Sequence, residues 1–282
     1  DVLGSRGLGD VYKRQIQFIF MKREEIFMNR LQNKVVLVTG GSSGIGLDAA
    51  KKMSEEGAIV YITGRNVKRL ESALECFENQ VFAITADSSS KEDMDRVCEM
   101  IRQQHGRVDV IFANAGVGKY VSLKDLTEED IDWTFNINVK GTIFTVQSML
   151  PILSEGGSII LNTSITSDLG LPDFSLYAAS KAAVRSFIYS WTKDLQEKRI
   201  RINAVSPGII PTAAATGELG RSEKEEQERQ QYRASLTPLG RVGNVKDTSD
   251  AIIFLASDES SYITGVELKV DGGLSAVFAN QL

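Results

Sequence analysis

Short apolar runs alternate with segments of helical periodicity from Lys34 to Gly273, and this alternation limits the fold more than any other feature of the sequence. The runs are continuously apolar and rich in β-branched residues, which is typical of strands that are covered on both faces of a sheet. Because a helical segment follows each run, the strands are expected to pair in parallel. No linker interrupts this span, so a single domain over residues 31–282 is predicted, with a doubly wound α/β sheet of about seven strands and helices on both faces. The expected strands are 34–39, 58–63, 81–86, 108–113, 158–164, 200–206 and 266–270.

Three of the intervening segments show helical spacing most clearly, at residues 45–57, 90–106 and 127–153. The last of these opens with Thr127, which is followed three residues later by Asp130, as in a helix N-cap. A long polar insertion covers about residues 212–237. Its composition fits either a solvated helix or a lid over a site, and both readings stay open.

The bulk composition excludes several classes of function. The 282 residues carry a net charge of −5 and are 42% hydrophobic, which is typical of a globular protein and argues against a nucleic-acid binder or a partner of anionic membranes. A single histidine, His105, argues against a Ser-His-Asp hydrolase or a multi-histidine metal site, and no metal is expected. Cys76 and Cys98 are expected on helices as buried or half-buried free thiols, which favours a reducing, cytoplasmic compartment.

Residues 1–30 show no regular apolar pattern. They are expected to be a disordered or non-native tail, with Met21 or Met28 as alternative starts. Gly4, Gly7 and Gly9 form a glycine cluster here, but no strand precedes it, so a flexible tail is the preferred interpretation.

A second glycine cluster does follow a strand. The first expected strand leads directly into "TGGSSGIG", in which Gly40, Gly44 and Gly46 have the spacing G-x-x-x-G-x-G. Missing side chains let backbone amides approach a pyrophosphate, and the next helix offers its N-terminus to that charge. The loop therefore predicts a dinucleotide site that also includes Ser42, Ser43 and Ile45.

The end of the second strand indicates which dinucleotide is bound. A carboxylate there would bind the ribose hydroxyls of NAD, but Gly64, Arg65 and Asn66 occupy these positions. Arg65 can instead make charge-assisted hydrogen bonds to a 2′-phosphate, so NADP(H) is preferred, with NAD(H) possible.

Further along the chain, Asp87 and Ser88 follow the third strand, where Asp87 can accept from the adenine amino group. The fourth strand ends in Asn114, Ala115 and Gly116, where the cofactor can pass close to the backbone and Asn114 can tie strand ends together.

The segment "YAASK" separates Tyr177 from Lys181 by four residues, so on a helix the two side chains point the same way. One reading is structural, a phenol and an ammonium that happen to share a face. The other is chemical, a cation that lowers the pKa of the phenol so that it can exchange protons near neutral pH. The five residues alone do not decide between them.

The motifs "TGGSSGIG", "NAG", "NINVKG", "NTSITS", "YAASK" and "SPGII" occur in this order at suitable spacing, and over residues 31–275 the chain resembles the compact single-domain branch of the short-chain dehydrogenase/reductase family. The resemblance implies a Rossmann-type fold and an oxidoreductase that interconverts a carbonyl and a secondary alcohol. It implies that Tyr177 is the general acid or base and that Lys181 binds the nicotinamide ribose and lowers the pKa of Tyr177. Ser164 would bind the substrate oxygen, and Asn138 would anchor a water.

The resemblance also places Pro207, Gly208 and Ile210 near the nicotinamide, with Thr212 assigned less firmly to the cofactor because Pro211 is an extra proline in this loop. It implies a homotetramer, or a homodimer. Apolar residues of the two helices that carry Asn138 and Tyr177 could form the subunit interface or ordinary core, and this choice stays open; they are Phe144, Val146, Phe187, Ile188 and Trp191.

Two other functions remain on the same fold. One is a non-catalytic NADP(H)-binding redox sensor, which the presence of the complete set Asn138, Ser164, Tyr177 and Lys181 disfavours. The other is an isomerase or dehydratase. The substrate is a small molecule whose class is open, with pocket walls expected from residues 117–120, 165–174 and 212–237. A carrier-protein substrate is not favoured, because the insertion mixes acidic and basic residues.

Overall fold

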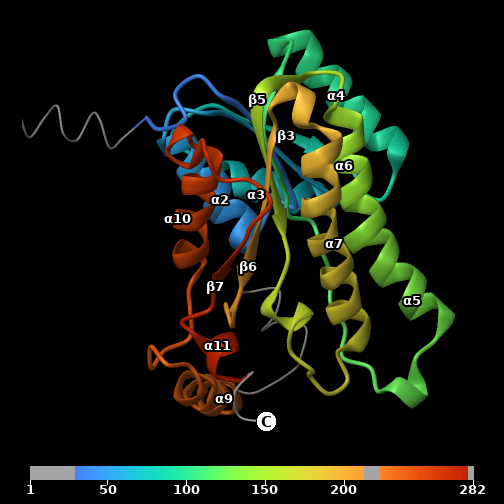
Figure 1. The fold of residues 1–282 in the computed structure, drawn as a ribbon, viewed down its shortest axis with the longest axis vertical. Coiled ribbons are helices and arrows are strands. Elements are labelled where there is room, and N and C mark those ends of the chain that lie inside the picture. Colours follow the sequence, from blue (N-terminus) through green and yellow to red (C-terminus); the bar gives the residue numbers. More distant parts are fainter. Residues whose placement is uncertain (1–28, 213–222, 279–282) are drawn as a thin grey trace, which may run out of the picture.

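The structure is a computed structural model that describes residues 29–212 and 223–278. Seven parallel strands form one sheet in the order β3-β2-β1-β4-β5-β6-β7, and helices cover both faces (Figure 1), so the predicted fold is confirmed. The strands are β1 Val35–Thr39, β2 Ile59–Gly64, β3 Val81–Thr85, β4 Val108–Ala113, β5 Leu153–Asn162, β6 Arg201–Pro207 and β7 Glu267–Val270. The α-helices are α2 Gly44–Glu55, α3 Val67–Leu74, α4 Lys91–His105, α5 Glu128–Phe135, α6 Gly141–Met149, α7 Ser175–Asp194, α9 Glu223–Leu236, α10 Val245–Ala256 and α11 Leu274–Phe278.

The strands are apolar throughout because alternate residues enter two different cores. In β1, Val35 and Leu37 pack with helices α4, α6 and α7, whereas Val36 and Val38 pack with α2, α3 and α10. Figure 1 shows these two helix layers on opposite sides of the sheet. Helices therefore shield both faces of the sheet from water, as the continuous apolar runs predict.

Local signals set the helix ends. Thr127 caps α5 in a capping box with Asp130, as the sequence predicts. Helix α4 ends at His105, and Gly106 follows with φ +72°, a left-handed conformation that favours glycine. Cys98 is buried on α4, but Cys76 lies exposed in the turn after α3, so the expectation of a second half-buried helical thiol is wrong.

The segment expected as one helix over residues 127–153 is divided. A π-helical turn at Asn136–Lys140 separates α5 from α6, and β5 already begins at Leu153. The turn widens the helix at Asn138, and the Thr142 hydroxyl donates to the Asn138 carbonyl at 2.7 Å. Such widened turns occur frequently at functional sites.

The tail predicted at residues 1–30 lies outside the described residues up to residue 28. Asn29 and Arg30 are described, and both backbone amides donate to Glu56 Oε2 at 3.1 Å. Of the insertion expected at residues 212–237, residues 213–222 also lie outside the described part, and α9 forms most of the remainder.

Candidate active site

The ends of the parallel strands meet at one edge of the sheet, and a cleft of about 740 Å³ follows this edge. The order of strands reverses between β1 and β4, which is the switch point where open α/β sheets bind ligands. Every residue that the sequence assigns to the cofactor or to catalysis lines this cleft, except Asn138. The structure therefore brings together motifs that are spread over most of the sequence.

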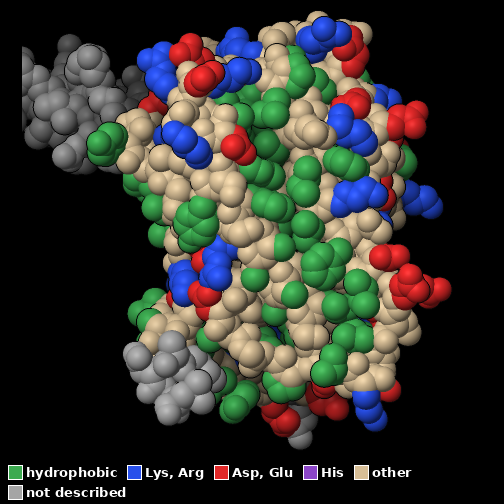
Figure 2. Space-filling view, turned by 45° about the vertical axis from the view of Figure 1, so that its right-hand side comes forward, with side chains coloured by type: hydrophobic (Ala, Val, Ile, Leu, Met, Phe, Trp, Pro, Cys, Tyr) green, Lys and Arg blue, Asp and Glu red, His purple; other side chains and the backbone are tan. Residues whose placement is uncertain are grey.

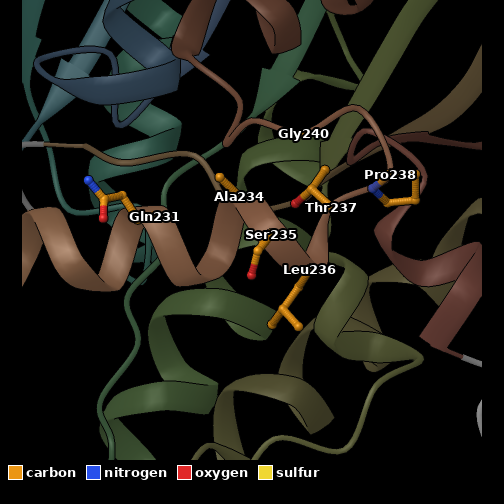
Figure 3. A pocket seen from close by; sticks show the side chains of 7 residues that line it. All are labelled: Gln231, Ala234, Ser235, Leu236, Thr237, Pro238 and Gly240. Atoms are coloured by element: carbon orange, nitrogen blue, oxygen red, sulfur yellow. The ribbon is translucent and has the colours of Figure 1, made fainter.

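A second hollow of about 590 Å³ lies on helix α9 and the loop that follows it (Figure 3). It is lined by Gln231, Ala234, Ser235, Leu236, Thr237, Pro238 and Gly240. None of these lining residues is titratable, and none was assigned to the cofactor or to catalysis from the sequence. The larger cleft at the strand ends is therefore the candidate active site.

The glycine loop is shaped for close backbone approach. Gly40 and Gly44 have φ values of +64° and +55°, which other residues rarely adopt. A Cβ on Gly46 would lie 2.4 Å from the Gly40 carbonyl oxygen and 2.5 Å from Asn114 Nδ2. Glycine is therefore required at all three motif positions, by the backbone conformation at Gly40 and Gly44 and by the close contacts at Gly46.

The start of helix α2 leaves backbone donors for a ligand. Ser43 occupies the N-cap but makes no side-chain capping bond, and the first turn contains no acidic residue. The first N–H groups of a helix have no intrahelical partner, and the helix dipole favours an anion beside them. The loop and helix therefore fit a dinucleotide pyrophosphate.

Asn114 ties three strand ends together, as its position after β4 indicates. Its Nδ2 donates to the Thr39 carbonyl at 2.9 Å and to the Gly40 carbonyl at 3.2 Å. Its Oδ1 accepts from Asn162 Nδ2 at 2.8 Å. Asn162 Oδ1 is buried in the cleft without a hydrogen-bond partner among the described residues, which leaves an acceptor for a bound group.

Arg65 follows β2 directly and is exposed at the cleft, with Arg69 beside it on α3. Within the described residues, neither guanidinium forms an ion pair, although Asn66 Oδ1 accepts from the Arg69 backbone amide at 3.0 Å. Asp87, after β3, uses one carboxylate oxygen to accept from the Ser89 amide at 2.9 Å and its hydroxyl at 2.7 Å. This end of the cleft is cationic.

Tyr177 and Lys181 lie one turn apart on α7, as predicted. Ser164, which stands at the N-cap of the short 3₁₀ helix Ile165–Ser167, lines the same cleft as Tyr177 and acts to lower the pKa of its phenol. Lys181 Nζ donates to the Asn162 carbonyl at 2.7 Å and lies 5.6 Å from the centroid of the Tyr177 ring. A phenol, a hydroxyl and an ammonium therefore share one end of the cleft.

Burial controls the proton affinities of both groups. It raises the pKa of Tyr177 to about 12, although the Ser164 side chain acts in the opposite direction. It lowers the pKa of Lys181 to about 8. The expected lowering of the Tyr177 pKa by Lys181 stays a prediction.

Asn138 stands behind the cleft and is only 1% exposed. Its Oδ1 accepts from the Val117 amide and its Nδ2 donates to the Val117 carbonyl, both at 2.8 Å. Nδ2 also donates to Ser180 Oγ at 2.9 Å. The side chain thus fixes the strand β4 loop against helix α7, and the water-anchoring role stays a prediction.

An aromatic stack holds the Tyr177 ring. Tyr120 and Phe174 have ring centroids 4.2 Å apart, and Phe174 and Tyr177 have centroids 4.5 Å apart. Gly118 packs against the same rings, where a Cβ would lie 2.9 Å from Tyr177 Cδ2. The stack also forms the predicted apolar wall of the pocket.

A network of charges fixes the Ser164 loop from outside the cleft. The Thr163 hydroxyl donates to Glu267 Oε1 at 2.6 Å. Asp168 pairs with Arg185 and, at 2.7 Å, with Lys269. Arg185 lies one turn beyond Lys181 on helix α7. The helix therefore carries Tyr177 and Lys181 and, through Arg185, also supports the loop that bears Ser164.

Several cleft residues were missed from the sequence, among them Trp133, Ile137 and Asn162. Asn162 had a readable signal, since it is a polar residue at the end of an apolar strand, as Asn114 is. Trp133 and Ile137 precede Asn138 on the same helical segment, and only the packing of that segment shows which of its apolar residues face the cleft.

Comparison with known proteins agrees with this geometry. The family model described as enoyl-(acyl carrier protein) reductase matches residues 40–275. Oxidoreductase asL5 of Sarocladium schorii is 40% identical over 89% of this chain and 99% of its own length. The 3-oxoacyl-[acyl-carrier-protein] reductase FabG of Thermotoga maritima is 36% identical over 87% of this chain and 99% of its own. The crystal structure of levodione reductase superposes with a TM-score of 0.82 at 28% identity, covering 87% of this chain and 98% of that one.

Among the described residues, no helix is both long and apolar enough to cross a lipid bilayer. The family generally uses NAD(P)(H) and acts on small molecules. Strand order, glycine loop and matched sequences agree, and the chain is an oxidoreductase of the short-chain dehydrogenase/reductase family.

Proposed function

We propose that the protein is an NADP(H)-dependent oxidoreductase that interconverts a carbonyl and a secondary alcohol, with Tyr177 as the proton donor and acceptor. The observation that carries this proposal is the placement of the Tyr177 and Ser164 side chains in the same cleft as the glycine loop, where Ser164 acts to lower the pKa of the phenol. A proton donor and a second hydroxyl at that place suit a substrate oxygen whose charge changes during the reaction.

Different groups of the chain would bind different parts of the cofactor. The amides at the start of α2 would hold the pyrophosphate, and Arg65 would hold the 2′-phosphate of NADP(H) in the absence of a carboxylate after β2. Lys181 would hold the nicotinamide ribose. The missing side chain of Gly116 would let the nicotinamide ribose and Lys181 lie close to the backbone, since a Cβ at this position would lie 3.2 Å from Lys181 Nζ. NAD(H) remains the weaker alternative.

The bound cofactor supplies or accepts the hydride. In carbonyl reduction, Ser164 donates a hydrogen bond to the substrate oxygen as charge develops on it, and Tyr177 transfers a proton to that oxygen. A phenol with a pKa of about 12 is protonated at neutral pH, which suits this direction. In alcohol oxidation the phenol must first lose its proton, so a neighbouring positive charge is needed to lower its pKa.

We further propose that helices α6 and α7 form a subunit interface in a homotetramer or a homodimer. Val146 and Ile188 are fully buried core residues, so they do not contribute to it. Phe144, Phe187 and Trp191 are only partly buried, and the last two rings stack at 4.6 Å. Figure 2 shows hydrophobic side chains over the centre of this face of the molecule, with charged side chains gathered toward its ends and edges. The molar mass in solution, measured by light scattering, tests this point.

The catalytic proposal is tested with purified protein in two steps. Fluorescence titration should show tighter binding of NADPH than of NADH. NADPH oxidation should then be measured against ketones, diketones, keto-sugars and a β-ketoacyl thioester. Turnover of at least one carbonyl class with NADPH is expected. Tight NADPH binding without turnover of any carbonyl would favour a redox sensor or an isomerase on the same fold.

A further inference from the structure

Helix α9 brings two arginines to the candidate active site. Arg229 and Arg233 are half-buried and line the same cleft as Ser164 and Tyr177. Figure 1 shows α9 beyond the ends of β6 and β7. The end of β6, at Pro207, lines this cleft. The mixed charges of this segment suggested a solvated helix, and the carboxylates whose positions are described, Glu225 and Glu228, are exposed. Arg229 and Arg233, in contrast, line the cleft.

Neither of these guanidinium groups has an anionic partner in the described part of the chain. Other arginines of the protein are paired with carboxylates, for example Arg30 with Glu56 and Arg241 with Asp247. A half-buried guanidinium gives up part of its hydration, and this loss is normally offset by an anion or by hydrogen-bond acceptors. The missing partner is therefore expected to be a ligand.

The whole cleft is cationic, although the protein has a net charge of −5. Among the described residues, its lining holds six basic side chains and a single carboxylate, that of Asp87. The basic residues are Arg65, Arg69, Lys119, Lys181, Arg229 and Arg233. A cleft with this excess attracts anions and raises their local concentration.

The proposed binding of NADP(H) uses only some of these cations. Arg65 and Arg69 lie at the end assigned to the 2′-phosphate, and Lys181 is assigned to the ribose. Lys119 is paired with Asp130 at 2.6 Å. Of the described basic residues, Arg229 and Arg233 are the two that remain. They line the same cleft as Pro207 and Gly208, which the family resemblance places near the nicotinamide.

We propose that Arg229 and Arg233 bind an anionic group, a carboxylate or a phosphate, on the carbonyl substrate. This inference rests on the proposed function and narrows its substrate class to oxo acids and ketone phosphates. Residues four apart on a helix have neighbouring side chains, so both guanidinium forks can reach one anion. The rings of Tyr120, Trp133 and Phe174 line the cleft and offer contacts to an apolar body between the anion and the carbonyl.

The test compares acids with their neutral counterparts. NADPH oxidation is measured with pyruvate, levulinate and benzoylformate, with the methyl ester of each, and with dihydroxyacetone phosphate against dihydroxyacetone. At least one anionic member should exceed its neutral counterpart in kcat/KM by about tenfold or more, the size expected for a charge-assisted hydrogen bond. In the double variant Arg229→Gln/Arg233→Gln this preference should vanish because KM for the anionic compound rises. The kcat/KM for its neutral counterpart should stay unchanged. Arg233→Lys, which keeps the charge and loses the fork, should retain part of the preference.

Arg102→Gln is the matched control, because Arg102 is exposed on α4, pairs with Glu99 and is not among the residues that line the cleft. It should leave the preference unchanged. A wild-type enzyme that does not distinguish acids from neutral compounds would overturn the proposal. It would also be overturned if the double variant weakened NADPH binding by about tenfold and kept the substrate preference, since the arginines would then serve the cofactor phosphates.

Failure of the proposed function gives a different result. If no carbonyl in the set is turned over, the NADPH complex is titrated calorimetrically with the same acids and esters. Tighter binding of an acid that depends on Arg229 and Arg233 would support the anion site without the reductase activity. Equal binding by the wild type and the double variant would overturn it.

Discussion

Lys181 directs its hydrogen bond to the carbonyl of Asn162 at 2.7 Å, while its Nζ lies 5.6 Å from the ring centroid of Tyr177. The two side chains share a helix face, and burial shifts the proton affinities of both. It raises the pKa of Tyr177 to about 12 and lowers that of Lys181 to about 8. The free protein therefore holds a protonated phenol beside a cation that is poorly solvated, and binding of the cofactor should change both.

The buried cation should reduce the stability of the free protein. The pKa of Lys181 is about 8 in the folded chain and near the ordinary 10.5 in the unfolded chain, so the unfolded chain binds more protons between these values. The free energy of unfolding should then rise with pH across this window, by up to roughly 3 kcal/mol relative to Lys181→Met, which cannot titrate. Urea unfolding of both proteins between pH 7 and about pH 10 measures this difference. Parallel pH profiles would show that Lys181 is not the cause.

Arg65 should decide between the two dinucleotides. Arg65→Ala removes the charge proposed for the 2′-phosphate, so the Kd for NADPH should rise by about tenfold to a hundredfold and the Kd for NADH should stay nearly constant. Lys68→Ala is the control, because Lys68 is an exposed neighbour on α3 that does not line the cleft. A ratio of the two Kd values that stays at the wild-type level would remove the argument for NADP(H).

A methyl group at Gly46 should close the space that the glycine loop keeps open. The new Cβ would meet the Gly40 carbonyl oxygen at 2.4 Å, and backbone cannot move aside cheaply. We expect Gly46→Ala to destabilise the fold by roughly 1–3 kcal/mol and to weaken NADPH binding more than tenfold. In Gly170→Ala the Cβ has no neighbour within 4 Å, so this control should leave NADPH affinity at the wild-type level. Normal NADPH binding by Gly46→Ala would contradict the proposed path of the cofactor over this loop.

The fold could be predicted because each strand is visible in the sequence as a continuous apolar run. Runs such as Val35–Thr39 are apolar at every position, which only a sheet covered on both faces accommodates, and all seven expected strands are present. The π-helical turn at Asn136–Lys140 could not be predicted, since α and π turns draw on the same residues and tertiary contacts choose between them.

The candidate site was predictable where residues follow strand ends, as Gly40, Arg65 and Asn114 do. Two properties were not readable in this way. The pKa of Tyr177 depends on how much water surrounds it, and burial is the largest influence on it. The arginines of α9 face the cleft only because the helix docks at the sheet edge, and the sequence of that helix is polar on every side.

The central claim is that Tyr177 transfers the proton, and Tyr177→Phe tests it most directly. This variant removes one hydroxyl and keeps the ring that stacks on Phe174, so NADPH affinity should change less than about threefold while kcat for carbonyl reduction falls by about 10²–10⁴-fold. Tyr189→Phe is the control, because Tyr189 lies on the same helix and is 62% exposed. Loss of turnover in Tyr177→Phe with normal NADPH binding and a fully active Tyr189→Phe is the predicted result. Wild-type turnover by Tyr177→Phe would contradict the account.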